Sequence, residues 1–171
     1  VWVGLSAANV LEFAAPGALQ GRVVSGRAFG SAAIWASHHA VAAWQPNSHL
    51  LLDVIEHYFG QTPDLDELVR RGQLLQAEGL KSIFEEVRRQ KPKAAMAINW
   101  CFNEPWPAAA NMSLLCWPSI PKPSLAAVSA SCRPVVASAR IAKYAWVAGE
   151  IFNPELWLLN DSPEDLPPGR I

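Results

Sequence analysis

The chain has 171 residues, of which 51% are hydrophobic and only 17% are charged, and its formal net charge is −1. This balance does not suggest a nucleic-acid-binding surface, which would need a large cluster of Lys and Arg, and no apolar run approaches the roughly 20 residues that a membrane-spanning helix needs. Because a typical soluble domain carries about 25% charged residues, we expect part of this surface to pack against protein that the chain lacks.

The first residues predict neither a signal peptide nor a natural start. Val1 stands where an initiating Met would be, and no basic segment precedes an apolar stretch. We interpret this as a start within a longer protein, and the compartment stays open. The first predicted element is a short strand over residues 9–13, NVLEF, which carries Glu12 near its end. Periodicity alone does not separate this run from a buried helical turn.

Two helices are predicted in the middle of the chain. Residues 18–50 are rich in Ala, Gly and Ser and predict loops and short helices, and residues 50–59 predict an amphipathic helix that Gly60 ends. A longer helix is predicted from Thr62, as N-cap, to about Lys91, because acidic residues fill its first turn and apolar residues recur at helical spacing. Glycines within it predict a kink or close packing.

Residues 94–100, AAMAINW, are almost continuously apolar, which is typical of a parallel strand buried on both faces. A short helix is predicted over residues 124–131. Two antiparallel strands are predicted over residues 135–141 and 150–161. We expect residues 9–13 and 94–100 to pair as adjacent parallel strands, since the connection between them is long enough for a crossover.

The three cysteines, Cys101, Cys116 and Cys132, match no zinc-binding or CxxC spacing. We interpret them as buried free thiols. No metal site and no cofactor is predicted.

Four segments together resemble glycoside hydrolase family 2, in its β-mannosidase and exo-β-glucosaminidase-like branch. NWCFNEPWP is similar to the family's W-x-F-N-[DE]-x-W-P segment on the eighth strand of its barrel, and LEFAAPGA to the S-E-F-G-x-P segment on the seventh. The other two segments resemble the helix that leads into the next domain and the first hairpin of that domain. The four segments cover residues 99–107, 11–18, 121–140 and 146–161.

The resemblance implies an α/β fold, namely the C-terminal portion of a TIM (β/α)8 barrel followed by the first strands of an immunoglobulin-like β-sandwich. Residues 1–134 would hold barrel strands seven and eight, and residues 135–171 would begin the sandwich domain. The implied partner is the N-terminal part of the same protein, which this chain lacks. Unpaired strand edges would also favour self-association.

The implied chemistry is retaining hydrolysis of terminal β-linked sugars, β-mannosidase-like, by double displacement between two carboxyl groups. Glu12 would be the nucleophile, and the acid/base would lie on strand four, outside the chain, so the chain alone is expected to be inactive. The substrate would be a β-linked oligosaccharide or glycoside. Trp100 would form the apolar floor under the sugar ring.

Three other residues are candidates for substrate binding. Asn103 and Glu104 follow the end of the predicted strand, where barrel active sites lie, and they would either bind sugar hydroxyls or hold the loop. Trp44 belongs to an aromatic and imidazole cluster that would form an outer sugar subsite or pack the loop.

A second interpretation stays open. Leu11 and Ala14 stand where the family has Ser and Gly beside the nucleophile. A non-catalytic carbohydrate-binding or structural module, with altered carboxylates, would also fit. The sequence does not choose between mannose, glucosamine and galactose.

Overall fold

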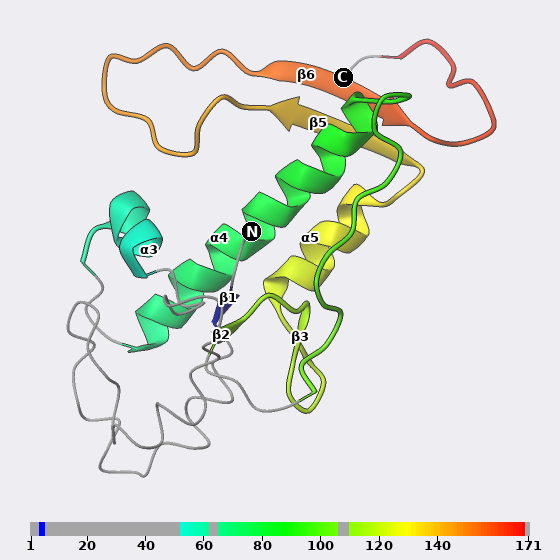
Figure 1. Ribbon diagram of the computed structural model, residues 1–171. Coiled ribbons are helices and arrows are strands. Elements are labelled where there is room, and N and C mark those ends of the chain that lie inside the picture. Colours follow the sequence, from blue (N-terminus) through cyan, green and yellow to red (C-terminus); the bar gives the residue numbers. More distant parts are fainter. Residues whose placement is uncertain (1–3, 6–51, 62–64, 106–109, 170–171) are drawn as a thin grey trace, which may run out of the picture.

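The computed structural model describes residues 4–5, 52–61, 65–105 and 110–169 (Figure 1). The strand expected over residues 9–13, with Glu12, and the segment 18–50, with Trp44, lie outside these residues. The elements in chain order are β1 (Gly4–Leu5), α3 (Leu52–Phe59), α4 (Leu65–Arg89), β2 (Ala110–Asn111), β3 (Leu115–Cys116), β4 (Ile120–Pro121), α5 (Pro123–Ser131), β5 (Val135–Arg140) and β6 (Glu155–Asn160).

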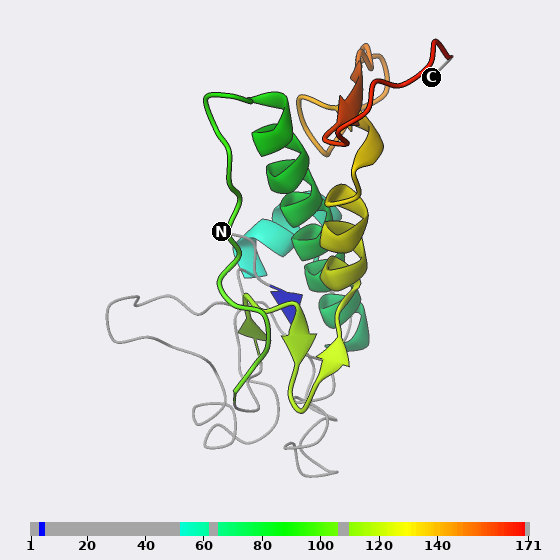
Figure 2. The ribbon, with the colours of Figure 1, turned by 90° about the vertical axis from the view of Figure 1, so that its right-hand side faces the viewer.

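Helices α4 and α5 lie side by side in both views (Figures 1 and 2). Leu80 of α4 and Val128 of α5 are buried together with Leu114, and Phe84 and Leu125 pack against this cluster. Helix α4 confirms the predicted long helix. It continues without a break through Gly72 and Gly79, which are both buried. The predicted short helix is also confirmed as α5, which has a proline at its start, where the missing N–H costs nothing.

Helix α3 ends as the sequence predicts. Gly60 has a φ of +73°, a left-handed conformation that glycine adopts without strain, and its N–H donates to the Glu56 carbonyl at 2.8 Å. Arg71 of α4 connects the two helices, because its Nη1 donates to the carbonyls of Phe59 at 3.0 Å and Gly60 at 3.3 Å. Its Nε also lies 2.7 Å from Glu67 Oε1. The corner between α3 and α4 is therefore tied by one guanidinium.

The expectation of a buried strand over residues 94–100 is wrong for the described structure. The segment runs from the end of α4 back toward β3 without a strand partner among the described residues (Figures 1 and 2). Met96, Ile98 and Trp100 are 72%, 81% and 76% exposed. A parallel strand is buried only when strands flank it and helices cover both faces of its sheet, and the described part of the chain provides neither arrangement around these residues.

The described strands form three two-stranded antiparallel ladders, β1–β2, β3–β4 and β5–β6. Parallel pairing between described residues is limited to one bridge, Asn103 with Leu115. Neither a barrel nor a sandwich is formed by the part of the chain that is described. The whole-barrel architecture and the domain division at residue 134 therefore stay predictions.

The predicted antiparallel pair near the C-terminus is confirmed as β5 and β6. The register runs from Val135 opposite Asn160 to Arg140 opposite Glu155. Val136 and Leu159 are buried. Figure 1 shows this hairpin lying across the end of α4, away from β1.

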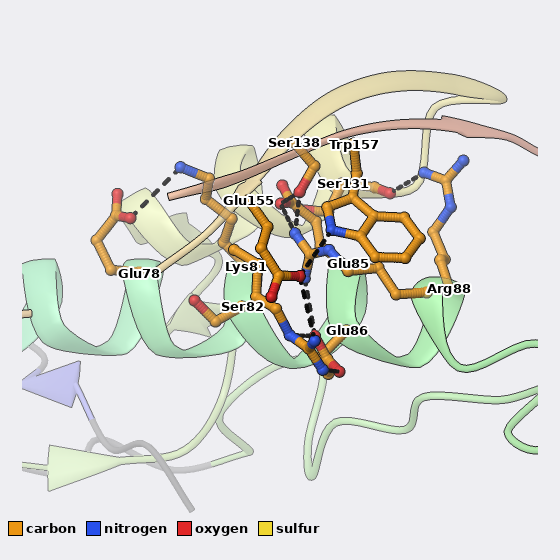
Figure 3. Close-up of polar contacts among 12 residues, drawn as sticks. Glu78, Lys81, Ser82, Glu85, Glu86, Arg88, Ser131, Ser138, Glu155 and Trp157 are labelled. Carbon is orange, nitrogen blue, oxygen red and sulfur yellow. Dashed lines mark hydrogen bonds and ion pairs between the residues drawn. The ribbon is translucent and has the colours of Figure 1, made fainter. Parts of the chain in front are cut away.

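A polar cluster attaches the hairpin to α4 (Figure 3). Glu85, 4% exposed, accepts hydrogen bonds from Ser131 of α5 at 3.3 Å and from Ser138 of β5. The Arg88 guanidinium donates to the Pro134 carbonyl at 2.9 Å and lies 2.9 Å from Asp161. Buried polar groups need such partners, so these contacts fix how the hairpin sits on the helix.

All three cysteines are free. Cys116 is buried as expected and Cys101 is half-buried, but Cys132, just after α5, is exposed, so the prediction of burial is wrong there. Cys132 is the C-cap residue of α5, one position beyond the last buried residue of the helix, Ser131.

Glu67→Gln is expected to remove a stabilisation that depends on pH. Hydrogen bonds from Arg70 and Arg71 lower the pKa of Glu67 from its ordinary value of 4.5 to about 2. A carboxyl whose pKa is lower in the folded protein stabilises the fold above its unfolded pKa and loses that effect as the pH falls through its folded pKa. In urea unfolding followed by circular dichroism, the free energy of unfolding of wild type should exceed that of the variant near neutral pH. This difference in free energy should vanish as the pH falls from 4.5 to below about 2. A difference that persists in strong acid would contradict this.

Arg88→Met is expected to lower the free energy of unfolding by about 1–2 kcal/mol, because the part-buried carbonyls of Ser131 and Leu159 lose a donor. Asp161 also loses one of its two cationic partners and keeps Lys91. Arg133→Met is the matched control, since Arg133 is exposed and donates only to the Ala130 carbonyl among its recorded contacts. The control should stay within about 0.5 kcal/mol of wild type. Equal effects of the two variants in urea unfolding would show that the cluster does not hold the hairpin.

Candidate functional site

The predicted site residues that the structure describes lie on one short segment, residues 100–104. Trp100 is 76% exposed, Phe102 is 60% exposed and Asn103 is also exposed. Glu104, by contrast, is only 1% exposed. The segment therefore presents an aromatic surface to the outside and one carboxylate to the inside. Glu12 and Trp44 lie outside the described residues, so their distance from this segment stays untested.

The outward surface is a row of apolar side chains at alternate positions: Met96, Ile98, Trp100 and Phe102. We call these four residues the apolar row. Asn99 points the other way and anchors the segment, since its Nδ2 donates to the carbonyls of Cys101 at 2.9 Å and Met112 at 3.4 Å. An exposed indole in a fixed segment offers a flat face, on which the C–H groups of a sugar ring can rest.

Beneath this surface lies a fully buried ion pair. Lys122 Nζ is 3.3 Å from Glu104 Oε1, and neither side chain is exposed. The other Glu104 oxygen accepts a hydrogen bond from the Trp117 backbone N–H at 2.9 Å, and Oε1 accepts one from Ser113 Oγ at 3.2 Å. Lys122 Nζ also donates to the Asn111 carbonyl at 3.0 Å. The pair is thus surrounded by polar groups that match its charges.

Burial is the main influence on Lys122, and it lowers the pKa of the ammonium group because a charged amine loses its hydration. The Glu104 carboxylate opposes this shift, and the thiols of Cys116 and Cys101 oppose it to a smaller degree. The Glu104 carboxylate is therefore the main charge that opposes the effect of burial on the pKa of Lys122.

A second set of contacts ties this region to α4. Gln76 is fully buried, and its Nε2 donates to the carbonyls of Met112 at 3.1 Å and Ser113 at 3.0 Å. Its Oε1 accepts from Ser124 Oγ of α5 at 3.1 Å. One amide therefore joins α4, the segment before β3 and the first turn of α5.

Sequence reasoning missed Lys122, Ser113 and Gln76. The signal that could have drawn attention to Lys122 was its place between two prolines, Pro121 and Pro123, at a helix start. Ser113 and Gln76 carry no pattern that separates them from ordinary surface residues.

Other site types find little support in the described part of the chain. No group of three or more His, Cys, Asp or Glu side chains is placed there to hold a metal ion. None of the described helices is long and apolar enough to cross a bilayer. A hollow of about 500 Å³ is lined by Tyr58, Phe59, Tyr144, Trp146 and their neighbours, and it does not include residues 100–104.

No protein-family model matches the chain, and no curated protein sequence matches it. Solved structures do share its fold. The exo-chitosanase CsxA of Amycolatopsis orientalis matches 59% of this chain with a TM-score of 0.51 and 20% identity, over 12% of its own length. A structure of the exo-β-D-glucosaminidase CsxA with a glucosamine-configured castanospermine matches 80% of this chain with a TM-score of 0.58 and 16% identity, over 16% of its length.

A third structure, the E541A variant of the same exo-chitosanase with PNP-β-D-glucosamine, matches 79% of the chain with a TM-score of 0.58 and 15% identity. The chain spans only 12–16% of the length of these structures. The likeness shows that its mixed helical and strand fold occurs within a glycosidase.

Gln76→Leu is expected to destabilise the protein by about 1–3 kcal/mol, because two carbonyls and the Ser124 hydroxyl lose their buried partner. Gln90→Leu is the matched control, since Gln90 is exposed. Thermal and urea unfolding should show a clear loss only for the first variant. If both behave alike, the Gln76 amide does not hold the segment before β3.

Proposed function

We propose that this chain is part of a retaining glycoside hydrolase of family 2 that removes terminal β-linked sugars from oligosaccharides. The observation that carries the proposal is that Trp100 and Asn103 are both exposed on one short segment, which the buried carboxylate of Glu104 anchors. Two independent facts support it: the four sequence segments that resemble the family, and a fold shared with part of an exo-glucosaminidase.

In this proposal Trp100 lies under the apolar face of the sugar and Asn103 donates or accepts a hydrogen bond to a hydroxyl group. Glu12 attacks the anomeric carbon and forms a glycosyl-enzyme, which water then hydrolyses. The acid/base carboxylate belongs to a strand outside this chain. The choice between β-mannoside and β-glucosaminide rests on loops outside the described residues.

Of the two roles open for Glu104, we assign it to holding the loop. Its carboxylate is buried, and it interacts with Lys122, Ser113 and the Trp117 N–H. A sugar hydroxyl could reach it only if these contacts were broken, which would leave the Lys122 ammonium buried without its counter-charge.

The apolar row supports the further proposal that more of the same protein packs here. A side chain such as Ile98, 81% exposed, gains about 1.5–3 kcal/mol when it is fully buried. Neighbouring barrel strands would supply that burial and would pair the backbone of residues 94–102. In their absence the same edge would favour self-association.

A non-catalytic carbohydrate-binding module is the second candidate. The observation that favours it is that Leu11 and Ala14 stand where the family has Ser and Gly beside the nucleophile. Such a module would bind β-linked sugars without turnover.

Glu12→Gln in the full-length protein is expected to lower kcat on an aryl β-glycoside by on the order of 10⁴- to 10⁶-fold, the range seen when a member of a catalytic unit is removed. Aryl β-glucosaminide, β-mannoside and β-galactoside should each be assayed. Glu164→Gln, at an exposed position, is the matched control and should leave kcat unchanged. The 171-residue chain by itself should show no turnover, because it lacks the acid/base.

Two outcomes would contradict the proposal. Sugar binding without turnover in the full-length protein would favour the binding module. Robust turnover by the isolated chain, abolished by Glu12→Gln, would show that both carboxylates lie within this chain.

A further inference from the structure

The Glu104–Lys122 ion pair is costly for a short segment to bury. Both side chains are fully buried with 3.3 Å between Nζ and Oε1, although Glu and Lys are almost never buried unless they are paired. Replacing such a pair by apolar residues is often neutral or stabilising, so its burial is weak evidence for a role in stability. Its position in the fold indicates a different role.

The pair connects three parts of the chain. Glu104 directly follows Asn103, and its backbone N–H donates to the Leu115 carbonyl at 3.1 Å. Its carboxylate reaches Ser113 and the N–H of Trp117. Lys122 directly precedes α5, and its backbone N–H donates to the Leu114 carbonyl at 3.0 Å. The exposed segment, the strand β3 and the helix α5 are thus held at one point.

The contacts around the pair also have a fixed polarity. The carboxylate accepts from a backbone N–H, that of Trp117, and the ammonium donates to a backbone carbonyl, that of Asn111. Neither backbone group can exchange its role. A glutamate fits only at position 104 and a lysine only at position 122, so the pair specifies one arrangement of the segment instead of merely neutralising charge.

We propose that Glu104 and Lys122 are positioning residues for sugar binding: they set Trp100 and Asn103 in the single arrangement that a β-linked sugar requires, and they do not touch the sugar. This inference rests on the function proposed above. It extends that function, because it makes the affinity for the sugar depend on a buried ion pair that does not contact the sugar.

The test compares Glu104→Gln, Lys122→Met and the double variant in the full-length protein. Each single change leaves one charge buried without its partner, whereas the double change leaves none. Each single variant should lose about 10²-fold in kcat/KM on the aryl β-glycoside that wild type hydrolyses best, the cost of a small misplacement of binding groups. The loss should appear mainly as a higher KM. The kcat/KM of the double variant should be at least tenfold higher than that of either single variant (about 1.4 kcal/mol).

A second measurement follows order in the segment without any sugar. Hydrogen exchange read by mass spectrometry should speed up about 10²-fold in peptides covering residues 102–105 and 113–117 of each single variant, and much less in the double variant. Peptides of α4 should keep their wild-type protection. The charge swap Glu104→Lys with Lys122→Glu should behave like a single variant, because Trp117 N–H and Asn111 C=O keep their polarity.

Lys81→Met is the matched control, since Lys81 forms an exposed pair with Glu78 at 3.4 Å, and it should change neither readout. The positioning role is overturned if the single variants keep wild-type exchange in both peptides, if exchange rises equally throughout α4, or if the swap restores KM. Failure of the proposed function is a different result. Wild type would then hydrolyse no β-glycoside, while the hydrogen-exchange pattern would still show whether the Glu104–Lys122 ion pair orders the segment.

Discussion

The described structure depends on one constraint: helix α4 must provide partners for polar groups that its packing buries. Its apolar contact with α5 is made by Leu80 and Val128, which are buried together with Leu114. The Gln76 side chain donates to two backbone carbonyls and accepts from a serine hydroxyl. Further along the helix, the Glu85 carboxylate accepts hydrogen bonds from two serines. Because a buried polar group without a partner costs more than a hydrogen bond gains, these contacts select how α5 and the β5–β6 hairpin sit on α4.

The sequence predicted the elements whose signals are local. The signals at Gly60, in the acidic first turn of α4 and in the alternation of β5 each depend on a few neighbouring residues. The predicted bounds of the helices and the hairpin are therefore close to the observed ones. Residues 94–100 were misjudged because the burial of a parallel strand depends on neighbours distant in sequence. The ion pair between Glu104 and Lys122 could not be predicted for the same reason, namely that it joins residues distant in sequence. Lys122 is far along the chain, and only the bridge between Asn103 and Leu115 brings the two charges together.

The shortage of charge in the composition agrees with where apolar side chains are exposed. Besides the apolar row, Ile151, Phe152 and Leu156 around the hairpin are 86%, 59% and 64% exposed. Contiguous apolar surface of this kind marks sites where other protein packs. The chain spans only 12–16% of the length of the matched structures, which agrees with the proposal that more of the same protein packs here.

The change of direction at Asn103 separates the exposed aromatic side chains of the segment from its buried carboxylate. In a regular strand residues 100, 102 and 104 would share one face, and a carboxylate at 104 would then lie beside the indole, ready to bind a sugar. Here Trp100 and Phe102 are exposed while Glu104 is buried, because Leu114 and Leu115 both donate to the Phe102 carbonyl at 3.0 Å and the chain then pairs at Asn103. Alternation alone would therefore place the Glu104 carboxylate on the same face as the indole. The pairing turns that carboxylate inward, where its charge can order the segment and where water cannot weaken the interaction.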